Sequence, residues 1–250
     1  MTDDQKYIYG LHTCNAQLRL DPQSIEILYL KNTPHNKQIL KIIDNCKIAG
    51  INIVQLEKDQ LTTMCLSSKH QGIVMQLSNN SFSGFDLDLY LQREPSPFIV
   101  IFDSLQDPRN LGSCIRSANA AGVQLVIKRR SNSCEISPLV HKIASGGLQG
   151  ISLLETNNLS SIIKKLKNNN VMILGTSDMG SKSLYNLNNI TGSGVAVIIG
   201  AEGEGISKSL LEACDVVCSI PIYGTVECLN VAVATGITLY QIKKLIKKTK

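Results

Sequence analysis

The 250-residue sequence lacks the features that mark several common classes of protein. It contains no apolar run of the about 18 to 20 residues that a membrane-spanning helix needs, so an integral membrane protein is excluded. Its first six residues include two acids and no basic region followed by an apolar stretch, so we expect no secretory signal. These absences predict a cytoplasmic protein.

Signals for disulfides and metals are also missing. Eight cysteines are too few for a disulfide-stabilised scaffold of this length, and none forms a C-x-x-C pair, so we expect reduced thiols. The four histidines, His12, His35, His70 and His141, are far apart in the sequence. They give no ligand spacing typical of a structural zinc site, and no metal is expected.

The charge is only weakly biased, with a formal net charge of +5 and a pI of about 8.7. Two clusters supply much of the excess, Lys128-Arg129-Arg130 and the C-terminal lysines at positions 243, 244, 247, 248 and 250. Either cluster could bind a polyanion, or it could lie at a helix end and complement the helix dipole. This modest charge and an aromatic content of 4% argue against tight RNA binding by one domain alone.

Hydrophobic periodicity predicts two α/β domains joined by a linker. In residues 1–77 we expect helices near 10–20 and 36–46 and strands at 25–30, 51–54 and 72–77. Residues 78–97 contain Ser-Asn-Asn-Ser-Phe-Ser-Gly and Glu-Pro-Ser-Pro, a composition typical of a linker. The second domain is expected to occupy residues 98–250.

In the second domain, near-continuous apolar strands alternate with helices, which predicts a parallel sheet covered on both faces. We expect strands at 98–103, 123–127, 171–174, 195–199 and 216–222, and helices at 111–121, 159–167, 208–213 and 231–246. Ligands of such sheets bind beyond the carboxyl ends of the strands. The loops after Asp103, Leu174, Ile199 and Ile222 are therefore where function is expected.

The first of these loops leads through Asn110 to Arg116. Asn110 could be a helix N-cap that satisfies free backbone N–H groups, or it could act on a substrate. Arg116, one to two turns inside the helix, could bind a carboxylate for structure or a phosphate for function. The residues alone leave both alternatives open.

Two later loops hold further polar and glycine-rich sequence. The stretch Gly200-Ala-Glu202-Gly203-Glu204-Gly205 has the order G-x-x-G-x-G, and no acidic residue ends a strand about 20 residues later, so a dinucleotide fingerprint is rejected. Its glycines let the backbone approach a ligand closely, and Glu202 could equally be a solvated loop carboxylate. In the last loop, Cys228 could be a small buried apolar residue, and Asn230 could again be an N-cap.

Together and in this order, these blocks resemble the three motifs of the SpoU/TrmH branch of the SPOUT RNA 2′-O-ribose methyltransferases. The blocks are Asn110-x-Gly112-x-x-x-Arg116, Gly200-x-Glu202-x-x-Gly205, and Ile220-Pro-Ile through Leu229-Asn230-Val-Ala-Val-Ala. The resemblance covers nearly the whole chain. Three further segments are most similar to the members that methylate a guanosine of bacterial 23S ribosomal RNA: Tyr9-Gly10-Leu11-His12, His70-Gln-Gly-Ile and Ala201-Glu202-Gly203-Glu204-Gly205.

The resemblance implies a C-terminal SPOUT domain whose parallel sheet ends in a trefoil knot, a rare exception to unknotted connectivity. It implies a small N-terminal domain similar to the L30e ribosomal RNA-binding proteins. It also implies a homodimer that uses S-adenosylmethionine as methyl donor, without a metal. Its cofactor pocket corresponds to Thr176, Gly200, Ile220 and Leu229. Its catalytic set corresponds to Asn110, Arg116, Glu202, Cys228 and Asn230.

RNA rather than DNA is the expected partner, because only RNA carries the 2′-OH. The family's arginine has been proposed as the base, but a guanidinium with a pKa above about 12 is a poor proton acceptor, so Arg116 is expected chiefly to hold the target phosphate. Cys228 and Glu227 depart from the family pattern, which usually has serine at the first position and often a small polar residue at the second. Three functions therefore stay open: 23S ribosomal RNA methylation, transfer RNA 2′-O-methylation, and an rRNA-binding assembly factor with impaired catalysis.

Overall fold

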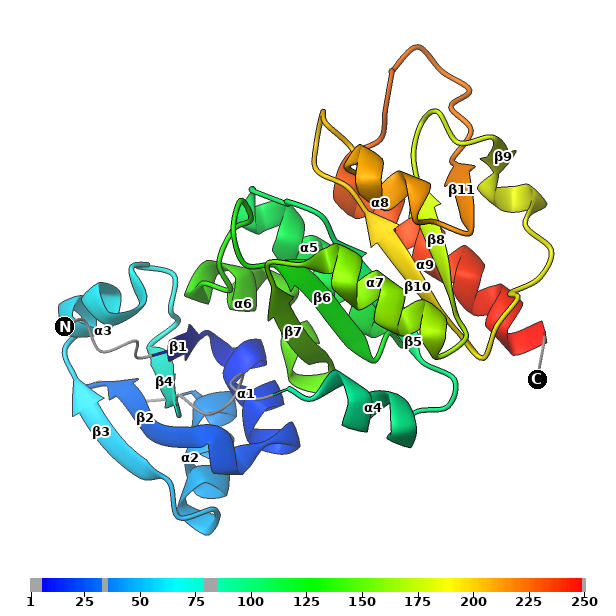
Figure 1. Ribbon diagram of the computed structural model, residues 1–250. Coiled ribbons are helices and arrows are strands. Elements are labelled where there is room, and N and C mark those ends of the chain that lie inside the picture. The colour runs from blue at the N-terminus through cyan, green and yellow to red at the C-terminus, as the bar shows by residue number, and fades with distance from the viewer. Residues whose placement is uncertain (1–5, 33–35, 79–84, 249–250) are drawn as a thin grey trace. The chain divides into compact units, whose positions relative to one another are not determined.

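The computed structural model of the chain describes residues 6–32, 36–78 and 85–248 (Figure 1). The remaining residues, 1–5, 33–35, 79–84 and 249–250, lie outside the described residues. His35, Lys250, most of the N-terminal segment and part of the expected linker fall among them.

The chain folds into two compact units, and the expected boundaries differ from the observed ones in two places. Unit 1 comprises residues 1–84 together with 136–150, and unit 2 comprises residues 85–135 and 151–250. The segment 136–150 was expected in the second domain, but it packs on the first. The expected linker contains the helix α4 (Leu87–Arg93), because Asp86 caps its N-terminus and Leu87 and Leu91 are buried.

Unit 1 is built on a four-stranded sheet with the order β1-β4-β2-β3. β4 is antiparallel to both of its neighbours, and β2 and β3 are parallel. The strands are β1 (Lys6–Tyr9), β2 (Ile25–Lys31), β3 (Asn52–Leu56) and β4 (Ile73–Leu77). The helices are α1 (Leu11–Leu20), α2 (Lys37–Ile48), α3 (Lys58–Cys65) and α6 (Pro138–Ala144), with short 3-10 turns η1 (Pro22–Ser24) and η3 (Gly147–Gly150).

Successive side chains along these strands point to opposite faces of the sheet, and each face contributes to a separate apolar cluster. Ile8 and Ile73 lie in a cluster with buried residues of α1 and α2. The next residues along the two strands, Tyr9 and Val74, lie in the other cluster, with Leu61 and Cys65 of α3. Helices therefore cover both faces of the sheet, as its period-two burial requires. The sequence prediction missed β1, α3 and α6.

The segment 136–150 joins unit 1 through α6 and η3. α6 packs against β1, and η3 packs against α1. Lys142 of α6 places its ammonium over the ring of Tyr9, 5.1 Å from the centroid, and donates a hydrogen bond to the carbonyl of Lys69 at 2.9 Å. These contacts explain why a segment that follows the second domain's early strands in sequence belongs to the small unit.

A buried histidine organises the loop between α3 and β4. His70 is 2% exposed, its Nδ1 accepts a hydrogen bond from the backbone N–H of Gly72 at 3.0 Å, and its Nε2 lies 3.3 Å from the Thr62 hydroxyl. Burial lowers the pKa of His70, and the nearby charges of Lys58, Lys142 and Lys31 lower it further. The folded protein therefore holds a neutral imidazole there.

Exchanging His70 for Asn is expected to make stability less dependent on pH. The unfolded chain binds a proton at this histidine near pH 6.5, whereas the folded chain resists it, so the free energy of unfolding falls as the pH drops below about 6.5. His70→Asn keeps an acceptor near the Nδ1 position and removes this dependence, which for one proton amounts to at most about 1.4 kcal/mol per pH unit. Denaturant unfolding between pH 7.5 and pH 5.5 measures it, with His12→Asn at an exposed histidine as control. An unchanged pH slope in His70→Asn would show that His70 titrates normally.

Unit 2 contains a seven-stranded sheet with the order β7-β6-β5-β10-β8-β11-β9, in which every recorded pair is parallel. The strands are β5 (Phe98–Phe102), β6 (Leu125–Arg129), β7 (Ser152–Thr156), β8 (Val171–Thr176), β9 (Lys182–Ser183), β10 (Gly194–Ile199) and β11 (Val216–Ser219). The helices are α4, α5 (Pro108–Ala121), α7 (Leu159–Asn168), α8 (Lys208–Glu212) and α9 (Val231–Lys248), with the 3-10 turn η4 (Leu184–Asn186). The parallel sheet expected from the sequence is confirmed, and β7 and β9 are additions to it.

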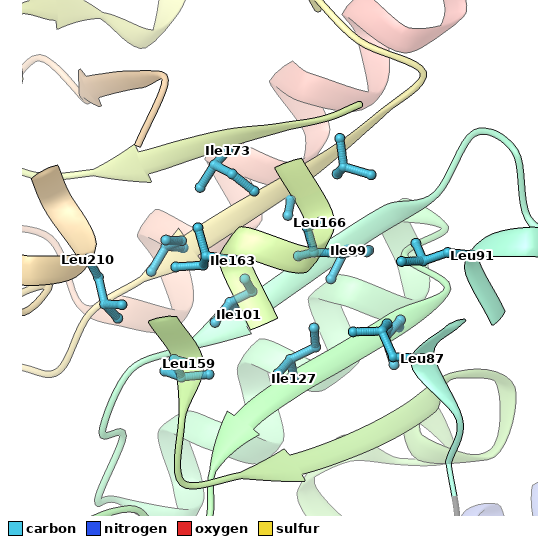
Figure 2. Close-up of a cluster of buried hydrophobic side chains, with 14 of the residues drawn as sticks. Leu87, Leu91, Ile99, Ile101, Ile127, Leu159, Ile163, Leu166, Ile173 and Leu210 are labelled. Carbon is cyan, nitrogen blue, oxygen red and sulfur yellow. The ribbon is translucent and has the colours of Figure 1, made fainter. Parts of the chain in front are cut away.

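One face of this sheet is covered by α4, α7 and α8, and the other by α5 and α9. Figure 2 shows the first face, where Ile99 and Ile101 of β5 lie with leucines and isoleucines of the three helices. On the opposite face, Lys243 of α9 lies over the ring of Phe98, 5.5 Å from its centroid. α5 and α9 pack against each other, and the buried Cys114 thiol meets the Thr235 hydroxyl at 3.4 Å. Among the described residues, no helix combines the length and the apolar character needed to cross a membrane.

Candidate functional site

Four loops that carry polar residues leave one edge of the parallel sheet. β5, β10, β8 and β11 are consecutive neighbours in the sheet, and they run in the same direction. Asp103, Gly200, Ser177 and Ile220 are the residues that directly follow these strands. The loops expected to carry function therefore emerge side by side at the carboxyl ends of adjacent strands.

Asn110 lies in the first turn of α5, with its side chain directed to another loop. The N-cap of α5 is Asp107, whose carboxylate accepts from the N–H of Arg109 at 2.8 Å, and Pro108 opens the helix. The alternative that Asn110 is the N-cap is therefore wrong, and α5 begins three residues earlier than expected. The Asn110 Nδ2 donates a hydrogen bond of 2.5 Å to Glu202 Oε1.

Asn230 caps α9 and also bonds to two other polar side chains. Its Oδ1 accepts from the N–H of Ala232 at 2.9 Å, as an N-cap of α9 does. Its Nδ2 donates to Asn110 Oδ1 at 3.1 Å and to Glu202 Oε1 at 3.4 Å. Asn110, Glu202 and Asn230, which we call the Asn–Glu–Asn cluster, thus come together from the first turn of α5, the loop after β10 and the residue before α9.

The glycine-rich loop after β10 presents Glu202 at the tip of a tight turn. Ala201 and Gly205 exchange two backbone hydrogen bonds of 3.0 Å, which close the turn. Gly205 and Gly203 have positive φ angles, and a Cβ placed on Gly200 would collide with the backbone of Gly205. Only glycine allows this close approach at position 200, so the sequence G-A-E-G-E-G sets the position of the Glu202 carboxylate.

A buried carboxylate that the sequence did not single out, Asp103, joins the end of this loop to the start of the β5–α5 loop. The Asp103 side chain is 3% exposed, and its oxygens accept from Arg129 Nε at 2.6 Å and from the backbone N–H of Ser207 at 3.0 Å. Burial raises the pKa of Asp103, but hydrogen bonds from Arg129 and Ser207 outweigh burial and lower it. An ionised Asp103 therefore ties the start of the β5–α5 loop to the start of α8. An acid directly after an apolar strand was the signal that could have identified it.

Two of the three cations of the cluster Lys128-Arg129-Arg130 form ion pairs with acids of the same unit. Lys128 is 1% exposed and its ammonium contacts Glu155 at 2.8 Å, while Arg129 contacts Asp103. Both residues lie in β6, so the alternative of a helix end is wrong. Two of the three cations are neutralised within unit 2, which leaves Arg130 exposed.

Among the described residues, no hydrogen bond joins Arg116 or Cys228 to the Asn–Glu–Asn cluster. Arg116 follows Asn110 by six positions, which places it about 120° around the helix from Asn110 and nearly two turns further along. It is exposed, and within the described part of the chain no carboxylate forms an ion pair with it. Cys228 is exposed in the loop before α9, so the alternative of a buried apolar residue is wrong.

The residues expected to hold a cofactor lie at or beyond the carboxyl ends of the neighbouring strands β8, β10 and β11. Thr176 ends β8, where its hydroxyl donates to the Ile198 carbonyl at 3.1 Å and so helps to join β8 to β10. Gly200 follows β10 and is buried, and Ile220 follows β11 and is half-buried. Leu229, also half-buried, precedes Asn230. In the described ranges, no three His, Cys, Asp or Glu side chains gather as a metal site would require.

Two known protein families match the chain. The SpoU rRNA methylase family matches residues 97–240, and an RNA 2′-O ribose methyltransferase substrate-binding family matches residues 7–83. The 23S rRNA (guanosine-2′-O-)-methyltransferase RlmB of Yersinia pestis is 35% identical over 236 residues, covering 94% of this chain and 95% of the relative. The protein of that name from Coxiella burnetii is 35% identical over 242 residues, covering 96% and 95%.

Solved structures share the fold. The SpoU methyltransferase AviRb from Streptomyces viridochromogenes, in complex with AdoMet, superposes with a TM-score of 0.81 at 19% identity, over 98% of this chain and 91% of that one. The AdoMet-bound rRNA methyltransferase from Sinorhizobium meliloti gives a TM-score of 0.77 at 20% identity, over 96% and 87%.

Proposed function

Because the chain belongs to the SpoU rRNA methylase family, we propose that it transfers a methyl group from S-adenosylmethionine to the ribose 2′-OH of a guanosine in 23S ribosomal RNA. The observation that carries this proposal is the meeting of Asn110, Glu202 and Asn230 at the carboxyl edge of the sheet. The relatives named above, which match nearly end to end, support the choice of a ribosomal guanosine. Such a substrate places the reaction in the cytoplasm.

The proposal includes a SPOUT domain with a trefoil knot in unit 2, an L30e-like RNA-binding domain in unit 1, and a homodimer. The likeness to SpoU methyltransferase structures supports the first, and the substrate-binding family match over residues 7–83 supports the second. The position of Arg116 supports the third. Arg116 is exposed about 120° around α5 from Asn110, a position that suits action at the Asn–Glu–Asn cluster of a second copy.

We propose that the loops after β8, β10 and β11 hold S-adenosylmethionine, through Thr176, Gly200, Ile220 and Leu229. The fit is supported by the close packing of these loops, since a Cβ on Gly200 would meet backbone and a Cβ on Gly180 would meet the backbone of Cys218 and Ser219. Exposed backbone amides and carbonyls, rather than charged side chains, would then face the nucleoside. When bound, S-adenosylmethionine supplies an electrophilic methyl group.

The residues of this chain would serve the reaction mainly by positioning. Glu202 accepts N–H bonds from both Asn110 and Asn230, and this fixes three side chains relative to one another before the RNA arrives. Holding two reactants in line can supply up to about 7 to 11 kcal/mol of the barrier, and side chains that are already fixed would hold the reactants with less loss of freedom. Arg116 would hold the phosphate next to the target ribose and orient the 2′-OH, because a guanidinium binds phosphate well and accepts a proton poorly. Cys228, a weak donor, would contact the RNA from the loop before α9.

Mapping of 2′-O-methylated positions on 23S rRNA, with and without this protein, tests the proposed function. We expect one guanosine to lose its methyl group when the gene is deleted and to regain it when purified protein and S-adenosylmethionine are added to the unmodified RNA. Methylation of transfer RNA alone would contradict the choice of substrate. Binding of S-adenosylmethionine with no transfer to any RNA would favour an assembly factor instead.

A further inference from the structure

Four lysines from separate segments of unit 1 surround the buried His70. Lys31 ends β2, and its backbone N–H donates to the carbonyl of Gly72 at 2.9 Å. Lys58 begins α3, and its carbonyl accepts from the hydroxyl of Thr62, the residue beside the His70 ring. Lys69 precedes His70, and its carbonyl accepts from the ammonium of Lys142. We call Lys31, Lys58, Lys69 and Lys142 the lysine face.

All four lysines lie on the side of the sheet that α3 covers. Tyr29, two residues before Lys31 on β2, packs against the cluster formed with α3, and alternate residues of a strand share a face. The ammonium of Lys142 lies over Tyr9, a member of the same cluster. α1 and α2 pack on the other cluster. The lysine face is therefore one surface rather than a scatter of cations around the unit.

In the described part of the chain, no acid pairs with the cations of this surface. Within the described ranges, no carboxylate lies at ion-pair distance from any of the four ammonium groups. The acids next to Lys58, Glu57 and Asp59, stand at the start of α3, where they complement the helix dipole. The mutual effect of the cations is visible in two places, since lysine charges lower the pKa of His70, and burial and then Lys69 lower the pKa of Lys142. Gathering like charges costs stability, and an anionic partner would remove that cost.

We propose that the lysine face binds the phosphate backbone of the substrate RNA, with Lys31, Lys58 and Lys69 as the contacting cations. This inference rests on the proposed function and names the surface of unit 1 that would act in it. The spread of the lysines over a strand end, a helix start and a loop suits a backbone that passes several segments. Lys142, held by Tyr9 and the Lys69 carbonyl, positions the loop that carries Lys69.

The test compares two triple variants that remove the same number of charges from the same unit. The first is Lys31→Gln, Lys58→Gln and Lys69→Gln. The control is Lys37→Gln, Lys41→Gln and Lys47→Gln on α2, whose side chains are exposed and which packs on the opposite cluster. Binding of unmodified 23S rRNA fragments is measured between 50 and 300 mM KCl, about the range in which phosphate contacts dominate.

For the first variant we expect RNA binding to be about tenfold or more weaker at 100 mM salt. The slope of log K against log salt should be shallower by about 2, because each lost phosphate contact removes about 0.7 to 0.9 from that slope. The KM for RNA should rise, while kcat and the affinity for S-adenosylmethionine stay unchanged. The α2 variant should resemble the wild type.

Equal losses of RNA affinity in both triple variants would show a general effect of charge and would contradict the proposal. An unchanged salt slope in the first variant would overturn it as well. A normal RNA affinity in the first variant together with the loss of an acidic protein partner would assign the surface to that partner instead. Failure of the proposed function would look different, because the unaltered protein would then methylate no RNA.

Discussion

Replacing Asn230 by Asp is expected to lower kcat/KM for methyl transfer by at least about 100-fold, the loss typical when a positioned hydrogen-bond donor is removed from a polar site. The substitution keeps the Oδ1 that caps α9, so the helix start is preserved. It replaces the Nδ2 donor by a second oxygen that faces Glu202 Oε1 and Asn110 Oδ1. The new carboxylate oxygen cannot donate to either acceptor, and its negative charge repels that of Glu202. The Asn–Glu–Asn cluster is therefore expected to open.

The matched control is Asn158→Asp. Asn158 caps α7 by accepting from the N–H of Ser161 at 2.9 Å. Unlike Asn230, its side-chain nitrogen donates no recorded hydrogen bond to another described residue. Activity and thermal unfolding of this control should stay close to the wild type. Asn230→Asp should unfold at nearly the same temperature as well, which separates a lost site from a lost fold. Turnover of Asn230→Asp within about threefold of wild type would mean that the cluster only joins loops, because transition-state contacts cost far more than that.

The second large effect is expected for Arg116→Ala, whose lost activity should be partly restored in a mixed dimer. Alone, it should lower methyl transfer by at least about 100-fold, because it removes the proposed contact with the target phosphate. A mixed dimer of one Arg116→Ala copy and one Asn230→Asp copy, isolated with two different tags, should recover about half of the wild-type activity, since one of its two sites combines an intact cluster with an intact arginine.

That recovery depends on Arg116 acting across the subunits. A dimer of two Arg116→Ala copies carrying the two tags is the control, and it should stay inactive. If Arg116 acted within its own chain, each site of the mixed dimer would lack one group, and the mixed dimer would be inactive too. A monomeric protein that is fully active would contradict the homodimer itself.

Much of unit 2 could be predicted from the sequence because its strands are apolar throughout. Segments such as Phe98–Phe102 and Gly194–Ile199 are buried along their whole length, and this pattern is typical of a sheet covered on both faces. Once the sheet is parallel, the loops after its strands must share an edge, and this brings Asn110, Glu202 and Asn230 together. The short elements were missed: β9 has two residues, and α6 begins at a proline after a stretch of small polar residues.

The rest depended on contacts between segments far apart in the chain. Arg129 lies in a run of three cations that suggests a polyanion, and only its partner Asp103, directly after the neighbouring strand β5, shows its structural role. Asn230 caps α9 and also joins the Asn–Glu–Asn cluster, because its two side-chain atoms act in different directions. A single amide side chain can therefore cap a helix with its oxygen and bond to another loop with its nitrogen.

The return of residues 136–150 to unit 1 affects the order in which a nascent chain can complete its structure. The amino-terminal unit leaves the ribosome first, but its Tyr9 ring and α1 obtain their last packing partners only after residue 150 has been synthesised. By then, two strands of the larger sheet, β5 and β6, have also been made. Domains of many proteins fold one after another from the amino terminus. In this chain the first domain matures only during the synthesis of the second, and an amino-terminal fragment ending at residue 84 would lack α6 and with it Lys142.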